Sequence, residues 1–227
     1  MSAGKAVAAL IPAYNEAERI FETVRAVLAV PEIADVLVVD DGSLDGTAGA
    51  ARRAGARVLS LPANAGKGEA LNRGAAIINA EVVALLDADL GSTAREVRRL
   101  LIPVLEGSAD LVIAGFPGSA RKKGKGGLGL VKRLARTGIK LFTGLELNSP
   151  LSGQRALTRE VLRLVTPFAA GFGVEVALTV KAARAGFRLL EVPVEMRHRE
   201  SGRDLRGFLH RGKQFWDVTK TMWELGR

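Results

Sequence analysis

The sequence predicts an α/β fold, with a mostly parallel sheet that carries helices on both faces. Three observations lead to this prediction. Short apolar runs alternate with helix-like segments through residues 6–115. Polar clusters follow several of these runs, and ligands bind beyond the carboxyl ends of strands in such sheets. The chain has 227 residues, 48% of them hydrophobic, which suits one α/β domain with a full core.

The first half supplies five strands and the helices between them. The strands are expected at Ala6–Pro12, Asp35–Asp40, Arg57–Leu61, Val82–Asp87 and Asp110–Gly115. The helices are expected from Asn15 to about Val30, from Asp45 to near Gly55, over Lys67–Asn79, and from Thr93 to Leu105. Asn15 with Glu18, and Thr93 with Glu96, have the spacing of capping boxes. Asp45 is expected to cap the helix that it precedes.

The second half is less regular. Gly115–Gly129 holds four basic residues among glycines, and we expect it to be a mobile loop. After it we expect a helix near Leu128–Phe142, a strand at Leu151–Ala156, a short helix capped by Thr158, a longer helix at Phe172–Ala185, a strand at Arg188–Val194 and a terminal helix from Asp204 to Trp223. No internal repeat and no clear second domain is visible, so residues 1–227 are interpreted as one domain.

The composition narrows the class of partner and the compartment. The formal charge of +9 and the pI of about 10.3 favour anionic partners. Nucleic acid is disfavoured because only 5% of the residues are aromatic and no nucleic-acid motif is present. Cysteine is absent, which excludes disulfides and thiolate metal sites. We find neither a signal-peptide pattern nor an apolar run of spanning length. We therefore expect a cytoplasmic protein, peripheral at most on the inner membrane face.

The pair Asp87 and Asp89 follows the apolar run Val83–Leu86 and predicts a metal site. Carboxylate oxygens are hard ligands that suit Mg²⁺ or Mn²⁺. A divalent cation there would neutralise a diphosphate. The same spacing is also common in turns that lead into a capped helix, so the interpretation depends on the neighbouring motifs.

Two further clusters lie at strand ends. Asp41 follows the second apolar run and can accept hydrogen bonds from a base or a ribose, whereas Asp45 is assigned a structural role. Pro12 and Ala13 can lie flat against a nucleobase, and Glu16 can reach the ribose or the base.

Lys67 lies between two glycines at a predicted helix start, where both the lysine and the helix N-terminus favour an anion. The segment lacks the Ser or Thr of a Walker A loop. No G-x-G-x-x-G follows the first strand, which argues against a dinucleotide oxidoreductase.

In order along the chain, I-P-A-Y-N-E, V-V-D-D-G-S-x-D-G-T, G-K-G-E-A-L and D-A-D-L resemble family-2-like glycosyltransferases of the GT-A fold. The resemblance spans nearly the whole chain. It implies a metal-dependent enzyme that uses a UDP- or GDP-linked hexose. It implies that the donor is held by Pro12, Ala13, Tyr14, Glu16, Asp41, Lys67, Asp87 and Ala88, and that Asp89 binds Mg²⁺ or Mn²⁺. Residues 1–115 would form the nucleotide-sugar half and residues 116–227 the acceptor half with a C-terminal helix.

Two subfamilies compete in the second half. Gly66–Leu71 and Thr166–Glu175 resemble glucosyl-3-phosphoglycerate synthases, and by that resemblance His198 completes the metal site. Leu151–Glu160 and Glu191–Val194 resemble dolichol-phosphate mannose synthases instead. The chain departs from both. Its Gly126–Gly129 stretch lacks the acceptor arginine of the first group, and Arg203-Asp204 replaces a serine and a lysine of the second.

The acceptor residues are assigned by their charge and place. Arg121 and its neighbouring lysines suit an anionic acceptor. Glu175 would position the acceptor hydroxyl or act as a base, or it is only a first-turn acid of its helix. Arg155 and Arg199 would meet diphosphate oxygens, with surface salt bridges as the alternative.

Our first hypothesis is hexosyl transfer to a small phosphorylated acceptor such as 3-phosphoglycerate, with Asp89, Glu175 and Lys67 as catalytic residues. The second is transfer to a polyprenyl or dolichyl phosphate at a membrane surface. The third is a non-catalytic nucleotide-sugar binder. A homodimer is considered, and the terminal helix is expected to pack on the domain in preference to resting on a membrane.

Overall fold

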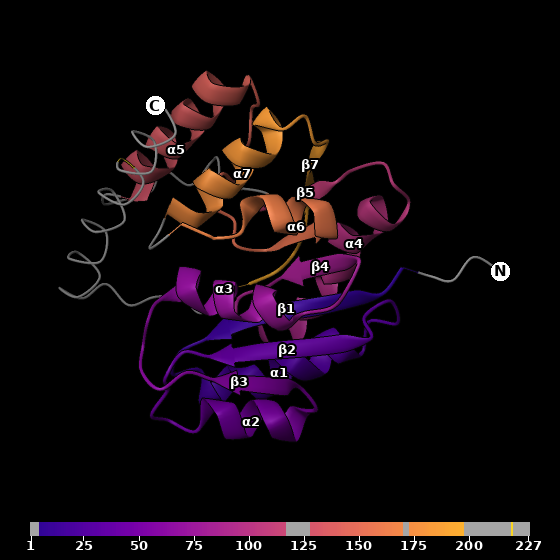
Figure 1. Ribbon diagram of the computed structural model, residues 1–227, viewed down its shortest axis with the longest axis vertical. Helices are drawn as coiled ribbons and strands as arrows, with labels where there is room; N and C mark the ends of the chain where they lie inside the picture. Colours follow the sequence, from indigo (N-terminus) through magenta and orange to yellow (C-terminus); the bar gives the residue numbers. More distant parts are fainter. Residues whose placement is uncertain (1–4, 117–127, 170–172, 198–218, 220–227) are drawn as a thin grey trace.

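The computed structural model describes residues 5–116, 128–169, 173–197 and 219 (Figure 1). These residues form a seven-stranded sheet in the order β3-β2-β1-β4-β6-β5-β7. The strands are β1 (Val7–Ala13), β2 (Asp35–Asp40), β3 (Arg57–Ser60), β4 (Val82–Leu85), β5 (Leu111–Gly115), β6 (Arg155–Thr158) and β7 (Leu189–Pro193). Every pairing is parallel except those of β6, which runs antiparallel to both β4 and β5. The predicted mostly parallel sheet is confirmed.

Helices cover both faces of the sheet, as predicted (Figure 1). One face carries α1 (Ala17–Leu28), α2 (Thr47–Ala54), the 3₁₀ turn η1 (Gly91–Glu96) and α4 (Val97–Leu105). The other carries α3 (Lys67–Ile77), α5 (Leu128–Thr143), α6 (Arg159–Val165) and α7 (Val174–Arg184). Successive residues of a strand point to opposite faces. In β1, accordingly, Ala9 and Ile11 belong to one apolar core and Leu10 to the other. This explains why the central strands are apolar without alternation.

β6 is shorter than predicted and begins later. The prediction placed a strand at Leu151–Ala156, but regular pairing begins only at Arg155, opposite Leu85 of β4. The reason is that β4 ends at Leu85, so residues 151–154 have no strand on that side, although the N–H of Ala114 in β5 still donates to the carbonyl of Gln154. This segment instead runs past the end of β4 towards the acidic residues that follow it.

The predicted capping boxes are wrong. The N-cap of α1 is Glu16 and makes no side-chain cap, and the N-cap of α2 is Gly46. Asp45 is not the N-cap residue of α2, but its carboxylate accepts the backbone N–H of Thr47 at the start of α2 as well as that of Ala17 at the start of α1, each at 3.1 Å. The cause is the adjacency of β1 and β2, which brings the two loops at their carboxyl ends together.

Of two further predicted helix caps, one is wrong and one is confirmed. Thr93 lies inside η1, where its hydroxyl donates to the carbonyl of Leu90, so it does not cap α4. Thr158 was predicted to cap a short helix, and it accepts from the N–H of Val161 at the start of α6. That prediction is confirmed.

The predicted Gly115–Gly129 loop falls largely outside the described residues, with Arg121 and its neighbouring lysines. The predicted terminal helix also lies outside them, except for Thr219. Within the part of the chain that the structure describes, no helix combines the length and the apolar character that crossing a bilayer requires.

Candidate active site

A cleft of about 310 Å³ opens where β1, β2 and β4 end at their carboxyl termini. This is where ligands bind in open parallel sheets. Its wall consists of Pro12, Ala13, Tyr14, Glu16, Asp41, Asn64, Gly66, Lys67, Ala70, Asp87, Ala88 and Asp89. All eight residues that the sequence predicted for the nucleotide sugar are in this wall, and so is Asp89, one of the two predicted metal ligands. The structure therefore brings together residues from four separate motifs.

The two loops after β1 and β2 hold each other in place. Asn15 donates its backbone N–H to the hydroxyl of Ser43 and accepts the N–H of Leu44 on its side-chain oxygen. The N–H of Glu16 donates to the hydroxyl of Thr47 at 2.8 Å. These bonds satisfy the free backbone groups at the start of α1. They leave the ring of Tyr14, which is 46% exposed, at the mouth of the cleft.

Asp41 shapes the cleft floor. Its two carboxylate oxygens accept the backbone N–H groups of Ala65 and Gly66, each at 2.8 Å. The chain therefore turns sharply before α3. Gly42 allows this close approach, because its φ is +72° and a Cβ there would lie 2.6 Å from the backbone of Ala63. Asp41, predicted to hold the nucleoside, thus lines the cleft and also fixes the loop that delivers Lys67.

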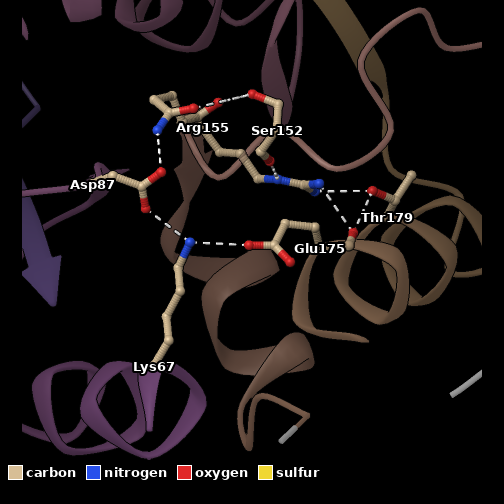
Figure 2. Close-up of polar contacts among 7 residues, drawn as sticks. Lys67, Asp87, Ser152, Arg155, Glu175 and Thr179 are labelled. Atoms are coloured by element: carbon tan, nitrogen blue, oxygen red, sulfur yellow. Dashed lines mark hydrogen bonds and ion pairs between the residues drawn. The ribbon is translucent and has the colours of Figure 1, made fainter. Parts of the chain in front are cut away.

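Lys67 joins two parts of the fold. From the first turn of α3 its ammonium group lies 2.8 Å from Asp87 and 3.0 Å from Glu175 (Figure 2). Burial alone lowers the pKa of a lysine, but the carboxylates of Asp87 and Glu175 outweigh that effect and raise the pKa of Lys67. The side chain therefore carries its positive charge throughout the neutral range, beside a cleft lined by acids.

Glu175 lies behind Lys67 and outside the cleft wall. The residue is only 9% exposed and sits in the first turn of α7. Its carboxylate is linked to the cleft wall by its ion pair with the Lys67 ammonium group. The predicted catalytic and acceptor role of Glu175 therefore stays a prediction, now with a defined partner.

Arg155 corrects one prediction. It was expected to meet diphosphate oxygens, but it is only 1% exposed. Its guanidinium donates to the carbonyl oxygens of Ser152 and Glu175 and to the hydroxyl of Thr179 (Figure 2). Burial lowers its pKa to about 10, against the raising effect of Glu175, so it remains charged at neutral pH. Arg155 therefore ties α7 to β6 and is not available to a diphosphate.

Sequence reasoning missed Gln154. This residue is fully buried, and its side-chain amide donates to the Asp87 carboxylate at 2.5 Å. It also missed Asn64, Gly66 and Ala70, which complete the cleft wall. The signal for Gln154 was an uncharged polar residue between Gly153 and Arg155 at the entry of a strand. The signal for the other three was their place beside Lys67.

Three predicted site residues lie outside the described part of the chain, namely Arg121, His198 and Arg199. Among the described residues, no three His, Cys, Asp or Glu side chains gather in a way that could hold a metal ion. Asp89 does line the cleft two residues after Asp87. Oxygen donors of this kind fit Mg²⁺ or Mn²⁺. The chemistry of the acids in the cleft therefore suits a divalent cation, although these residues alone make an incomplete ligand set.

An α/β fold with a cationic side chain, strand-end acids and an exposed aromatic ring in one crevice is typical of proteins that bind a ligand at the carboxyl ends of their strands. Residues 8–165 match the family described as glycosyl transferase family 2, and the chain belongs to that family.

Relatives of the chain include three kinds of glycosyltransferase. The glucosyl-3-phosphoglycerate synthase of Mycolicibacterium smegmatis is 35% identical over 197 residues, covering 78% of this chain and 64% of that protein. The undecaprenyl-phosphate mannosyltransferase of Micrococcus luteus is 34% identical over 215 residues, covering 86% and 85%. The glycosyltransferase AglJ of Haloferax volcanii is 33% identical, covering 88% of this chain and 65% of AglJ. The chain thus spans under two thirds of AglJ and of the synthase.

Solved structures show the same fold. The glucosyl-3-phosphoglycerate synthase of Mycobacterium tuberculosis, in complex with Mn²⁺, UDP and phosphoglyceric acid, superposes with a TM-score of 0.81 at 29% identity. The match covers 98% of this chain and 79% of that one. The same enzyme with Mg²⁺ and UDP gives a TM-score of 0.78 at 27% identity. The predicted GT-A fold is confirmed, and these relatives hold a divalent cation together with the nucleotide.

Proposed function

We propose that this glycosyltransferase moves a hexose from a UDP- or GDP-linked donor to a small phosphorylated acceptor such as 3-phosphoglycerate, with the help of Mg²⁺ or Mn²⁺. The observation that carries the proposal is the cleft, where a permanently charged Lys67 lies beside Asp87 among the other predicted donor residues. A relative of the same fold that holds Mn²⁺, UDP and phosphoglyceric acid supports it.

The donor would lie along the carboxyl ends of β1, β2 and β4. Pro12 and Ala13 offer a flat apolar surface for the base, with the exposed Tyr14 ring beside it. Glu16, Asp41, Asp87 and Ala88 would meet the base and ribose. Asp89 would hold the cation together with His198. Once bound, the cation would neutralise the diphosphate.

The chain's own residues would stabilise the leaving group. Transfer breaks the bond between the anomeric carbon and a phosphate oxygen, through an oxocarbenium-like sugar. It forms a bond from that carbon to the acceptor oxygen. Negative charge then builds on the departing nucleoside diphosphate, near the ammonium of Lys67. Because the pKa of Lys67 is raised, this stabilisation does not depend on pH in the neutral range.

Glu175 would supply the acceptor side of the same reaction. Its carboxylate lies 3.0 Å from the Lys67 ammonium, and a hydrogen-bonding carboxylate there could position the acceptor hydroxyl and receive its proton. Arg121 and Arg199 would bind the acceptor phosphate. The division into a donor half, 1–115, and an acceptor half, 116–227, is part of the proposal.

A second candidate function is transfer to a polyprenyl phosphate. The match to the undecaprenyl-phosphate mannosyltransferase favours it, because that match covers 85% of the relative, against 64% for the synthase of Mycolicibacterium smegmatis. The absence of the acceptor arginine from Gly126–Gly129 also weakens the case for phosphoglycerate as the acceptor. In that case the protein would work at the inner membrane face, whereas the phosphoglycerate acceptor implies a cytoplasmic enzyme. A homodimer is compatible with either function.

The test is a transfer assay with purified full-length chain, UDP-glucose and GDP-mannose as donors, and Mn²⁺ or Mg²⁺. The acceptors are 3-phosphoglycerate and, in detergent, undecaprenyl phosphate. We expect the hexose to be transferred to 3-phosphoglycerate from one of the two donors, and only in the presence of metal. A mannosylated or glucosylated lipid phosphate alone would move the assignment to the second function. Metal-dependent donor binding with neither transfer nor donor hydrolysis would point to a non-catalytic binder.

A further inference from the structure

The segment Ser152–Arg155 contacts both acidic residues that Lys67 bridges, Asp87 through its carboxylate and Glu175 through its backbone carbonyl. It leads into β6, between the antiparallel neighbours β4 and β5, and so runs beside the end of β4, where Asp87 lies. Gln154 contacts Asp87, and Arg155 contacts the main chain of Glu175. Four consecutive residues therefore determine how the acids on either side of Lys67 are oriented.

Gln154 fixes the Asp87 carboxylate. Its Nε2 donates to one carboxylate oxygen of Asp87, while Lys67 donates to the other. The hydroxyl of Ser152 donates to Oε1 of Gln154 at 3.3 Å, which sets the amide orientation that presents Nε2 to Asp87. Because Gln154 is fully buried, its amide cannot exchange this partner for water without a cost.

Arg155 holds the backbone of Glu175, the residue that carries the other carboxylate. Its guanidinium binds the carbonyl of Glu175 and the hydroxyl of Thr179 one turn further along α7 (Figure 2). The start of α7 is therefore held against β6, and the Glu175 side chain begins from a fixed point.

Gly153 leaves the space that the Lys67 ammonium fills. A Cβ at this position would lie 2.7 Å from Nζ of Lys67 and 3.0 Å from a carboxylate oxygen of Asp87. The φ of Gly153 lies outside the left-handed region, so alanine would fit the backbone without strain. Any side chain at residue 153 would therefore act on the ion pair and not on the fold of the segment.

We propose that Gln154 and Gly153 are positioning residues of the donor site. Gln154 sets the rotation of the Asp87 carboxylate, and the bare Cα of Gly153 allows the Lys67 ammonium to rest against it. This inference rests on the proposed function, because it assumes that Asp87 and Lys67 meet the nucleotide sugar. It adds residues from the acceptor half of the chain to the set that determines donor affinity.

The test measures donor affinity by titration calorimetry with Mn²⁺ for the full-length chain and two variants, Gln154→Met and Gly153→Ala. UDP-glucose and GDP-mannose are both titrated, and the better ligand is used. Met keeps the length of Gln but cannot donate to Asp87, whereas Ala removes no hydrogen bond. We expect Gln154→Met to bind the donor roughly tenfold more weakly, as loss of a hydrogen bond to a charged group implies. We expect a loss of the same order in Gly153→Ala, because its Cβ would lie 2.7 Å from the Lys67 ammonium and displace it from Asp87. We expect the KM for the acceptor to be unchanged.

Two control variants separate positioning from stability. Asn72→Leu breaks a pair of hydrogen bonds between α3 and the Phe168 backbone, away from the Lys67 ion pairs. Gly49→Ala adds a Cβ with only an ordinary contact to Arg53 in α2. We expect Asn72→Leu to lower the melting temperature and Gly49→Ala to leave it unchanged or raise it, both with the donor affinity of the original chain.

The outcomes are distinct. Normal donor binding by Gly153→Ala or by folded Gln154→Met overturns the inference and leaves the proposed function intact. Weaker binding in both variants, but equally in Asn72→Leu, overturns it too, because the effect would then be one of stability. Failure of the original chain to bind either donor sinks the proposed function and this inference with it. Should Gln154→Met not fold, Gly153→Ala decides alone.

Discussion

Lys67 and Glu175 are 108 residues apart in the chain, yet the ammonium group of one lies 3.0 Å from the carboxylate of the other. The contact joins α3, which starts beside the donor cleft, to α7, on the same face of the sheet. It places the positive charge of the cleft next to a carboxylate of the second half. A charge change at Lys67 should therefore be felt by both halves of the reaction.

Lys67→Met should lower kcat/KM about a hundredfold, the scale seen when one charge-stabilising donor is removed from an active site. The substitution removes the cation that is proposed to face the leaving diphosphate, and it removes the ammonium group that Asp87 and Glu175 share. Steady-state kinetics with the identified donor measure the effect. Arg73→Met is the matched control, because Arg73 is an exposed cation of the same helix that pairs with Glu69. An equal loss in both variants would show that Lys67 contributes only general charge.

The donor side of the cleft could be predicted from the sequence because of how parallel sheets are built. Pro12, Asp41 and Asp87 each follow or end a strand, and the carboxyl ends of neighbouring parallel strands meet at one edge. Recognising the strands was therefore enough to place these residues near one another, without knowledge of any long-range contact.

The other side of the site depends on contacts that local sequence does not encode. Gln154 reaches Asp87 only because β6 inserts antiparallel between β4 and β5. Arg155 was predicted to meet diphosphate oxygens, and its burial follows from oxygens of Ser152, Glu175 and Thr179 that converge only in the folded chain. Asp45 accepts an N–H at the start of α1 in addition to that of Thr47 in α2 for the same reason, since the pairing of β1 with β2 brings Ala17 within its reach.

Asp89→Asn should abolish the effect of metal on donor binding. An amide oxygen is a weaker ligand than a carboxylate for a hard cation, so the variant should bind the nucleotide equally with Mn²⁺ and with EDTA. Calorimetry under both conditions measures this. A variant that retains the metal dependence of the original chain would remove Asp89 from the metal site.

Asp45→Ala is the matched control for Asp89→Asn, because it also removes an aspartate carboxylate. Its carboxylate binds Thr47 and caps the N–H of Ala17, and these bonds, which outweigh the effect of burial, lower its pKa. Its loss should lower the free energy of unfolding on the order of 1 kcal/mol. We expect the metal dependence of donor binding to persist in this variant, in contrast to Asp89→Asn.

Arg155→Met should be destabilising on the scale of about 3 kcal/mol, because it breaks a buried charged network and removes the guanidinium hydrogen bonds to three oxygens. Urea unfolding at neutral pH measures the change. Arg155→Lys should recover only part of the stability, since one ammonium cannot reproduce a planar fork. The opposite result would be an Arg155→Met chain that is as stable as the original but binds the donor more weakly. That result would support the predicted role of Arg155 at the diphosphate, against which its burial argues.

The ion pair of Asp110 and Arg188 should make the free energy of unfolding depend on pH in the acidic range. The Arg188 guanidinium binds both carboxylate oxygens of Asp110, and these hydrogen bonds lower the pKa of Asp110 in the folded chain. A carboxyl group with a lowered folded pKa stabilises the protein above its unfolded value, which is about 3.9. That stabilisation is lost as the pH falls through the lower, folded value.

Asp110→Asn should therefore be less stable than the original chain at pH 7, and the difference should shrink steadily below about pH 4. Urea unfolding of the two chains at a series of pH values gives the result. The exposed pair Lys140 and Glu146 supplies the control, because exposed ion pairs contribute little to stability. Glu146→Gln should show almost no difference at any pH. A gap between Asp110→Asn and the original chain that stays constant down to pH 3 would mean that Asp110 acts through its shape and not through its charge, because protonation would then leave its contribution unchanged.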